Sequence, residues 1–279
     1  MKRWLALMGG LALVSTPGLA RSTESNRDAI AAAVRGPDRT EEERARDVYR
    51  HPTETLEFIG IAPDMTIVEL APGAGWYTNI LAPLVRDQGR YIGVENDPEI
   101  FPDYPDYAAG LKAYPQTVAA APKKFGGDAR GTWILKGDIA PAGSVDMVLG
   151  IRFLHNWIAR GIADEALSKL HRTLKPGGVF AIVQHRAGED DTRDPVVIAE
   201  SGYVKQSYTI ALMNKHGFEL VAQSEINANP KDTRDHPEGV WTLPPTLELG
   251  DRDREKYLAI GESDRMTLKF VKPAPAIQP

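Results

Sequence analysis

The chain has 279 residues, of which 42% are hydrophobic and 25% charged, so it has enough apolar material for a buried core and is expected to form one large domain with additional segments. Its formal net charge is -5 and it has no long basic run, which argues against a nucleic-acid backbone as the main partner and favours a small molecule. Cysteine is absent, which excludes disulfides, thiolate nucleophiles and cysteine-ligated metal sites.

Residues 1–20 have the pattern of a cleavable secretory signal. Lys2 and Arg3 precede an apolar stretch that ends with the small residues Gly18 and Ala20. This stretch is shorter than the roughly 20 residues that a membrane-spanning helix needs. We therefore expect cleavage after Ala20 and a periplasmic or secreted protein that has no stable membrane insertion once the signal is removed.

The polar and charged segment 21–55 is expected to form a helical cap on the main domain, residues 56–279. Its clearest helix is predicted to begin near Thr40 and to end near Pro52, because proline disfavours the helical conformation of the residue before it. Arg46 and Arg50 are four residues apart and lie on one face of this helix. That face is either solvated or closes a pocket above the glycine-rich turn that follows the first strand.

From Met65 onward, short apolar runs alternate with helical segments, which predicts a parallel sheet with helices on both faces. Helices are expected near residues 77–85, 107–121, 163–174 and 203–215. The sequence LKPGG at 174–178 is expected to close the third of them, because a glycine after the last turn can adopt the left-handed cap conformation. Seven strands are expected, at residues 66–70, 91–95, 133–135, 145–149, 179–185, 218–226 and 267–271.

Residues 227–264 interrupt this alternation with a long polar segment that is rich in proline. Loops of this length in a compact domain are usually functional lids or disordered segments. Trp241 and Leu243 lie among the prolines, and large apolar side chains there favour an ordered lid that packs on the domain.

The sequence VELAPGAGWYT, residues 68–78, places a glycine-rich turn between the first strand and the next helix. Doubly wound sheets bind ligands at this position, because bare backbone and a helix N-terminus meet there. The dinucleotide fingerprint needs a third glycine where this chain has Thr78. Glu69 adds negative charge, which disfavours a phosphate and favours a cation. Trp76 and Tyr77 either line an organic ligand or pack in the core.

This turn and four later motifs resemble those of the class I S-adenosylmethionine-dependent methyltransferases. Glu69, Ala71, Gly73 and Gly75 match the first motif, with alanine in place of its first glycine. Glu95 matches the acid that binds the ribose hydroxyls in that family. The segments SVDMVLGIRFLHNW at 144–157 and LHRTLKPGGVFAIVQHR at 170–186 resemble later motifs of the family.

The resemblance covers about residues 46–226 and implies a doubly wound α/β fold with a seven-stranded, mostly parallel sheet whose last strand is antiparallel. It implies S-adenosylmethionine as the methyl donor. It also implies a contact between Asp138 and the adenine amino group. With its leader and lid, the chain is similar to a bacterial group of secreted methyltransferases. The cofactor-binding residues expected from the resemblance are Glu69, Ala71, Gly73, Gly75, Tyr77, Glu95 and Asp138.

His155 and His185 are the candidate catalytic residues, because each follows or ends a strand at its carboxyl end. His155 is a candidate base or acceptor-orienting group, and packing beside Trp157 is the alternative. His185 either faces the same crevice or satisfies neighbouring loops. Arg152 is a candidate for holding an anionic substrate, and a surface salt bridge is the alternative.

The leading interpretation is methyl transfer to oxygen or nitrogen of a small-molecule acceptor beneath the lid, and Trp241 favours a flat apolar acceptor. One alternative is an exported ligand-binding protein that keeps the fold without catalysis, since the methyl donor is made in the cytoplasm. Another is a nicotinamide-dependent oxidoreductase, which Glu69 and the missing third glycine disfavour. His155, His185 and His236 show no short ligand spacing, so no metal is expected.

Overall fold

The computed structural model describes residues 17–274. The expected signal segment, residues 1–20, lies largely outside the described residues, and the expected cleavage position after Ala20 falls inside the first helix, α1 (Pro17–Val34). Within residues 17–274, no helix combines the length and the apolar character needed to cross a membrane.

A seven-stranded sheet lies at the centre of the molecule, in the order β3-β2-β1-β4-β5-β7-β6. Strand β7 pairs antiparallel with β5 and β6, and the other neighbours pair parallel. The predicted doubly wound, mostly parallel sheet with an antiparallel last strand is therefore confirmed. The strands are β1 (Thr66–Leu70), β2 (Arg90–Glu95), β3 (Arg130–Trp133), β4 (Val145–Ile151), β5 (Leu174–His185), β6 (Glu219–Ser224) and β7 (Arg265–Val271).

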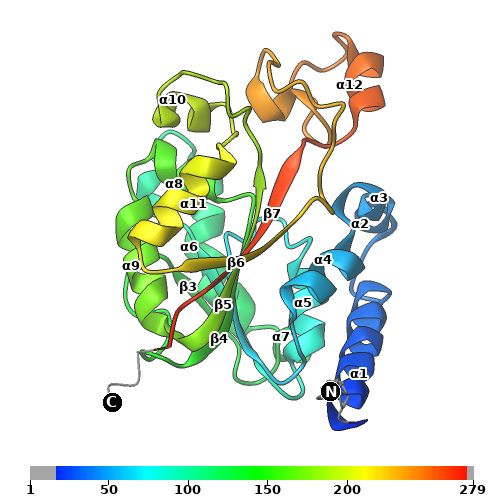
Figure 1. Ribbon diagram of the computed structural model, residues 1–279, viewed down its shortest axis with the longest axis vertical. Helices are drawn as coiled ribbons and strands as arrows, with labels where there is room; N and C mark the ends of the chain where they lie inside the picture. Colours follow the sequence, from blue (N-terminus) through cyan, green and yellow to red (C-terminus); the bar gives the residue numbers. More distant parts are fainter. Residues whose placement is uncertain (1–16, 275–279) are drawn as a thin grey trace, which may run out of the picture.

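Helices cover both faces of this sheet (Figure 1). One face carries α8 (Leu154–Ala159), α9 (Ala163–Thr173) and α11 (Gln206–Lys215), and the other carries α1, α4 (Pro52–Ile59), α5 (Thr78–Val85), α6 (Pro105–Ala119) and α7 (Pro122–Phe125). Val68 and Leu70 of β1 point into the first apolar layer, and Ile67 points into the second. A strand buried on both faces needs apolar residues at successive positions, which explains the nearly continuous apolar run.

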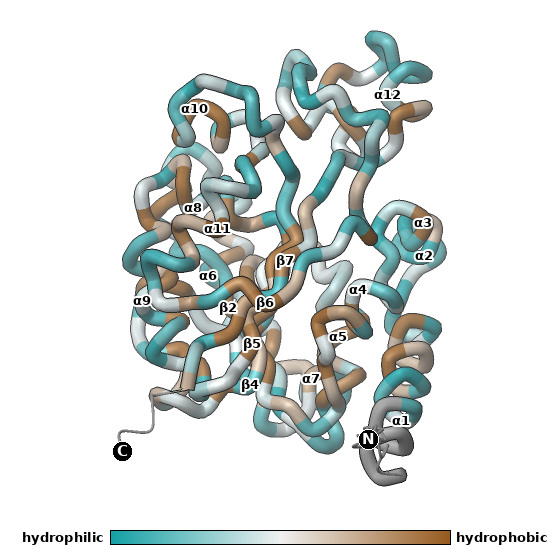
Figure 2. Tube along the Cα trace, viewed as in Figure 1, coloured by the Kyte–Doolittle hydropathy of each residue, from teal (hydrophilic) through white to brown (hydrophobic). Residues whose placement is uncertain are grey.

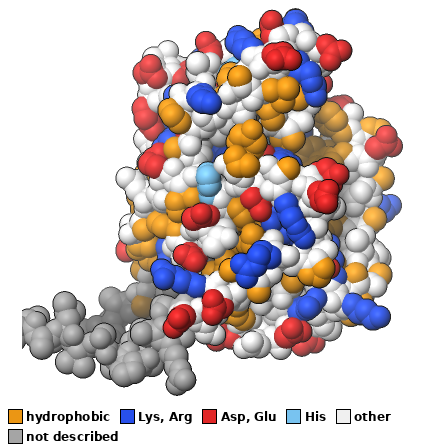
Figure 3. Space-filling model, turned by 90° about the vertical axis from the view of Figure 1, so that its right-hand side faces the viewer, with side chains coloured by type: hydrophobic (Ala, Val, Ile, Leu, Met, Phe, Trp, Pro, Cys, Tyr) orange, Lys and Arg blue, Asp and Glu red, His pale blue; other side chains and the backbone are white. Residues whose placement is uncertain are grey.

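Apolar residues concentrate in the strands and on the helix faces that pack against them, whereas α12 (Arg254–Ile260) and the loops near it are mostly hydrophilic (Figure 2). The face of the molecule drawn in Figure 3 carries acidic and basic side chains side by side. No extended patch of one sign is visible on this face.

The expectation of one helix from Thr40 to Pro52 is wrong, because the chain forms α2 (Glu41–Ala45), α3 (Asp47–Arg50) and then α4. Thr40 caps α2: its hydroxyl accepts from the Glu43 N–H at 3.2 Å, and the Glu43 carboxylate accepts from the Thr40 N–H at 3.0 Å. His51 has a φ of 41° and reverses the chain. Pro52 then occupies the first turn of α4, where its missing N–H costs no hydrogen bond.

The LKPGG segment does not close a helix. Helix α9 ends at Thr173, and β5 begins at Leu174. Gly177 has a φ of 78°, and its N–H donates to the carbonyl of Lys272 at 2.7 Å, beyond the end of β7. Gly177 therefore connects β5 to the end of β7. Strand β3 also ends at Trp133, where the sequence predicted a strand to begin.

Several helices were not expected from the sequence, namely α1, α4, α7, α8, α10 (Pro195–Glu200) and α12, with short 3₁₀ turns η1 (Pro98–Ile100) and η2 (Gly239–Thr242). Apart from α1, these helices have between 4 and 8 residues. A helix of one or two turns contains too few residues to show a periodic apolar face, so its sequence pattern carries little signal.

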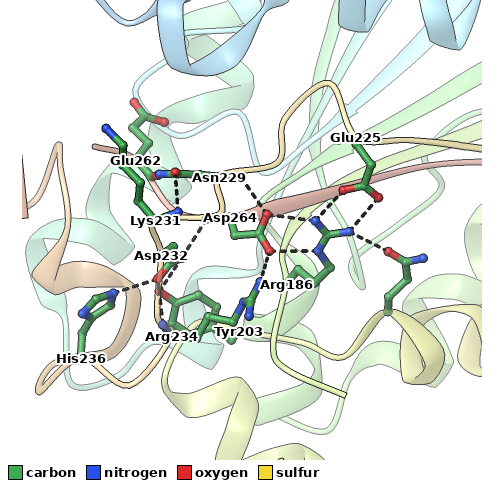
Figure 4. A network of polar contacts seen from close by, with 11 residues as sticks. Arg186, Tyr203, Glu225, Asn229, Lys231, Asp232, Arg234, His236, Glu262 and Asp264 are labelled. Carbon is green, nitrogen blue, oxygen red and sulfur yellow. Dashed lines mark hydrogen bonds and ion pairs between the residues drawn. The ribbon is translucent and has the colours of Figure 1, made fainter. Parts of the chain in front are cut away.

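The segment 227–264 joins β6 to β7 and is fixed to the domain by buried polar contacts (Figure 4). Asp264 is 1% exposed and accepts from Arg186 Nε and Nη2, both at 3.0 Å, and from Arg234 Nη2 at 2.6 Å. Asp232, also buried, accepts from the Tyr203 hydroxyl at 3.1 Å. Arg186 and Tyr203 belong to the domain, so these bonds hold both parts of the chain together.

We expect Asp264→Asn to lower the free energy of unfolding by about 2 kcal/mol, because two partly buried arginines, whose side chains are 19% and 34% exposed, lose a buried carboxylate partner. Denaturant titration measures this loss. Glu225→Gln is the matched control, since Glu225 also pairs with Arg186 at 2.6 Å but its side chain is 63% exposed. That control should cost less than about 1 kcal/mol. Equal losses in both variants would show that Asp264 does not anchor the segment.

Candidate functional site

The glycine-rich turn has three residues with positive φ, namely Ala71 (47°), Gly73 (57°) and Gly75 (82°). Ala71 therefore occupies a left-handed conformation in which a side chain is strained by about 1–2 kcal/mol. A Cβ atom built on Gly73 would meet only the carbonyl oxygen of Ala71, at 3.8 Å. The backbone at Gly73 is consequently open to an approaching ligand.

Glu69 is buried beneath this turn at 3% exposure. Its Oε2 accepts from the Tyr91 hydroxyl at 2.6 Å and from the Thr78 hydroxyl at 2.8 Å. Burial raises the pKa of Glu69 to about 7, and the hydroxyl bonds and Lys124 oppose that rise. Glu69 thus connects β1 with β2 and with the start of α5. It is not among the residues that line the cavity above the turn, so its expected cofactor contact stays a prediction.

Glu95 ends β2 and lies beside the turn. Its Oε1 accepts from the Gly73 N–H at 2.8 Å, whereas the only bond to Oε2 is a long one from the Asn96 N–H at 3.4 Å. Burial raises the pKa of Glu95 to about 6. Oε2 can therefore accept a further hydrogen bond, as a carboxylate that binds ribose hydroxyls must. Like Glu95, Asp138 is outside the lining of the cavity, and it is exposed, so its expected adenine contact stays a prediction.

A cavity of about 370 Å³ opens above the turn, at the carboxyl ends of β1, β4 and β5. The turn, the α2–α3 segment and the segment 227–264 all contribute to its walls, and Arg46 and Arg50 of the α2–α3 segment bind Glu262 of the segment 227–264. Its walls include Arg46, Arg50, Ala71, Gly73, Arg152, His155, Asn156, His185, Trp241, Pro244 and Pro245. The structure thus brings the two candidate histidines, part of the glycine-rich turn and the expected lid to one cavity.

His155 lies in the first turn of α8 and is 5% exposed. Its Nδ1 is 3.2 Å from Nε2 of Gln184. The orientation of Gln184 is fixed, because its Oε1 accepts from the Leu154 N–H and its Nε2 donates to the Gly202 carbonyl. Nδ1 of His155 must therefore accept, which assigns the ring proton to Nε2.

The charge state of His155 follows from its surroundings. Burial lowers its pKa to about 4, and the nearby Arg152 acts in the same direction. His155 is therefore neutral at pH 7 and is a weak base. Its Nε2–H is a hydrogen-bond donor, which favours the acceptor-orienting role over the role of a base.

His185 ends β5, and its Nδ1 is 2.5 Å from the hydroxyl of Ser263. Burial holds its pKa well below the usual value. The rings of His155 and His185 are 5.7 Å apart. His236 lies elsewhere, with Nε2 2.8 Å from Asp232. In the part of the chain from residue 17 to residue 274, no group of three or more His, Asp or Glu side chains is placed to hold a metal ion.

Trp76 fixes the N-terminal helices over the turn. The guanidinium groups of Arg39 and Arg50 lie over its ring, 4.8 and 4.6 Å from the centroid, and its Nε1 donates to the Glu43 carbonyl at 2.9 Å. Tyr77 is 5% exposed, packs edge-on against Trp76 at 4.7 Å and is not part of the cavity lining. These contacts agree with core packing for Tyr77, and its expected cofactor contact stays a prediction.

Sequence reasoning did not single out Gln184, Asp97, Glu262 or Ser263. Two features of the sequence could have identified two of these residues. Gln184 is a polar residue near the end of an apolar strand, and Asp97 lies two positions after Glu95. Asp97 accepts from the N–H groups of Leu135 and Lys136, at 2.7 and 3.1 Å, and so holds the loop after β3 beside β2.

Comparison with known proteins gives a fold and a partial family match. Residues 49–104, which contain the glycine-rich turn and Glu95, match the profile of the protein-L-isoaspartate(D-aspartate) O-methyltransferases. No match was found among curated proteins.

The fold is similar to that of a SAM-dependent methyltransferase from Aquifex aeolicus, with 15% identity, a TM-score of 0.50, and coverage of 88% of this chain and 98% of that one. An arsenic(III) S-adenosylmethionine methyltransferase from Chlamydomonas reinhardtii is 17% identical with a TM-score of 0.46, covering 89% of this chain and 74% of that one. The chain thus has the fold of the class I S-adenosylmethionine-dependent methyltransferases.

We expect Glu69→Gln to change the pH dependence of stability. Between pH 4.5 and about 7, the unfolded chain loses the Glu69 proton while the folded chain keeps it. This group therefore stabilises the fold fully below pH 4.5, and the contribution is lost as the pH rises through 7. The variant should gain up to about 3 kcal/mol relative to the wild type over this range, measured by urea titration at several pH values. A constant difference would contradict the raised pKa.

Proposed function

We propose that this protein transfers a methyl group from S-adenosylmethionine to a small-molecule acceptor bound beneath the segment 227–264. The observation that carries the proposal is the open backbone of Gly73 in the lining of a cavity in a methyltransferase fold, with the Glu95 carboxylate, itself outside that lining, accepting from the Gly73 N–H at 2.8 Å. The dinucleotide fingerprint needs a third glycine where this chain has Thr78, which favours S-adenosylmethionine over a dinucleotide at this turn.

The residues that would hold the donor lie on the turn side of the cavity. The backbone of Ala71 and Gly73 faces the cavity, and Oε2 of Glu95 would accept from ribose hydroxyls. When bound, the donor supplies an electrophilic methyl group on a positively charged sulfur. The protein then has to align donor and acceptor and to exclude water.

The acceptor would lie beside the two histidines and the segment 227–264. His155 would donate from Nε2 to an acceptor atom and so orient it. Trp241 packs edge-on against His155 at 6.0 Å, and Pro244 and Pro245 continue the wall. An apolar, flat body fits such a surface.

A protein carboxyl group is a second candidate acceptor, because the matching profile belongs to protein-L-isoaspartate(D-aspartate) O-methyltransferases. The matched residues 49–104 contain the donor side of the cavity. They include neither His155, His185 nor the lid. The match therefore supports S-adenosylmethionine as the methyl donor but does not bear on the acceptor. A small molecule remains the acceptor that we propose. Labelled donor incubated with the small-molecule and protein fractions of a cell extract separates the two candidates.

We expect wild-type protein to bind S-adenosylhomocysteine at micromolar strength and Gly73→Leu to weaken this binding at least tenfold, because the new side chain enters the cavity. Gly143→Leu is the matched control: Gly143 has a similar φ of 64°, a Cβ there meets nothing within 4 Å, and it lies outside the cavity. Isothermal titration measures both. Binding of NAD without binding of S-adenosylhomocysteine would support the oxidoreductase alternative and overturn our proposal.

His155→Ala should reduce methyl transfer at least tenfold while changing the affinity for S-adenosylhomocysteine less than about threefold, because His155 lies on the acceptor side. His171→Ala is a control on α9, outside the cavity. Since the pKa of His155 is about 4, its titration should cause no change in rate between pH 6 and 8. Equal losses of transfer and of donor affinity would instead indicate a structural role.

We also propose, from the sequence pattern of residues 1–20 alone, that the protein is exported and cleaved after Ala20. N-terminal sequencing of the protein from periplasmic and cytoplasmic fractions checks this. A mature start at Arg21 with no labelled product from any extract would favour the exported binding protein, and a start at Met1 would rule out cleavage.

A further inference from the structure

One wall of the cavity concentrates positive charge around a single carboxylate. Glu262 is 4% exposed and accepts from Arg46 Nε at 2.8 Å, from Arg50 Nε at 3.0 Å and from Arg265 Nη1 at 3.0 Å. Within residues 17–274, it is the one carboxylate in the cavity lining. Three guanidinium groups therefore share one negative charge.

Arg152 adds a fourth guanidinium group to this wall. It directly follows β4 with a φ of 57°, and its N–H donates to the Val183 carbonyl at 2.7 Å, which fixes its backbone. Its side chain takes part in no ion pair with the described residues, and its Nε is buried without an acceptor. Burial lowers its pKa to about 10, so it stays protonated at pH 7. Among the described residues, no acidic side chain forms the surface salt bridge that was the alternative for Arg152.

Buried donors on the same wall also lack acceptors. Among the described residues, Arg46 Nη2 and both Nη atoms of Arg50 have no hydrogen-bond partner. The face of Trp76, 4.6 Å from the Arg50 guanidinium, compensates part of this cost for Arg50. Unmade hydrogen bonds of buried donors each cost about 1–3 kcal/mol, and a bound anion would accept them.

The charge of the methyl donor does not neutralise the positive charge of this wall. The four guanidinium groups and the Glu262 carboxylate leave an excess of three positive charges. S-adenosylmethionine carries one carboxylate together with an ammonium and a sulfonium, so its net charge is positive. Binding of the donor alone would increase the excess, and a second ligand with negative charge is needed to lower it.

Building on the proposed function, we propose that the methyl acceptor is an organic anion whose carboxylate or phosphate group is bound by Arg152 together with Arg46 and Arg50. The planar guanidinium groups supply paired N–H donors that match either oxyanion. The apolar part of the acceptor would then lie against Trp241 and Pro244 of the lid.

Isothermal titration with benzoate and with phenyl phosphate tests this proposal, using the full chain with and without saturating S-adenosylhomocysteine. Benzamide and phenol are the neutral probes of similar shape. We expect one or both anions to bind at millimolar concentration and the neutral probes to bind at least tenfold more weakly. Arg152→Gln should weaken anion binding about 10- to 100-fold, the effect of losing a charge-assisted hydrogen bond. Arg172→Gln, on an exposed residue of α9, should leave it unchanged.

Three outcomes would overturn the proposal. Neither anion binds the wild type, or the neutral probes bind equally well, or Arg152→Gln leaves anion binding unchanged. A separate arm tests whether the arginines hold the donor's own carboxylate. In that case Arg152→Gln would weaken the binding of S-adenosylhomocysteine but not the binding of methylthioadenosine, which lacks the amino-acid part. This result would contradict the proposal. Anion binding with no binding of S-adenosylhomocysteine would refute the proposed function and leave the anion subsite standing.

Discussion

The cavity of this protein depends on the buried carboxylate of Glu262. It joins Arg46 and Arg50 of the N-terminal helices to a residue 216 and 212 positions later in the chain. It also binds Arg265 at the start of β7, which places the contact on the central sheet. A buried charge without partners is strongly unfavourable, so these segments have to meet where they do. Their meeting closes one side of the cavity over the glycine-rich turn.

The residues around Glu262 fix the segment 227–264 at its end nearest the sheet. Ser263 binds His185, and Asp264 binds Arg186, so three successive residues each contact a different part of the domain. The segment is therefore firmly attached just before β7. Trp241, in contrast, is 37% exposed and lies at the cavity. This arrangement gives a rigid base that holds the charged groups and leaves an aromatic side chain where an acceptor would enter.

Local patterns in the sequence were enough to predict the fold, whereas contacts between distant segments were not predictable. The strand at Thr66–Leu70 and the turn after it depend on adjacent apolar residues and glycines, so their position was correct. Arg46 and Arg50 were recognised as one face, but nothing in their neighbourhood indicates that Glu262 is their partner. LKPGG was misassigned because a glycine with positive φ serves a helix cap and a strand junction equally well.

The two glutamates of the motif show why a residue's position in a motif does not determine its role. Glu69 and Glu95 end or nearly end adjacent parallel strands, and burial raises the pKa of both. Glu69 accepts hydrogen bonds from the hydroxyl groups of Thr78 and Tyr91 and so links β1 to α5 and β2. Glu95 binds the turn backbone and keeps one oxygen with only a long contact. Each glutamate accepts two hydrogen bonds from the protein, so the kind of partner distinguishes them: Glu69 binds two side-chain hydroxyls of the framework, and Glu95 binds two backbone N–H groups, one of them in the glycine-rich turn.

The electrostatics of the acceptor side also bear on the chemistry. His155 and His185 are neutral with strongly lowered pKa values, so neither is a strong base, and the arginines favour a negative charge beside them. Methyl transfer to an oxygen that is already anionic forms the new C–O bond as the C–S bond breaks, and no proton has to be removed. An acceptor held as an anion would thus need from the histidines only orientation, which the fixed Nε2–H of His155 can provide. The positive charge of the cavity and the low basicity of its histidines are then both consistent with an anionic acceptor.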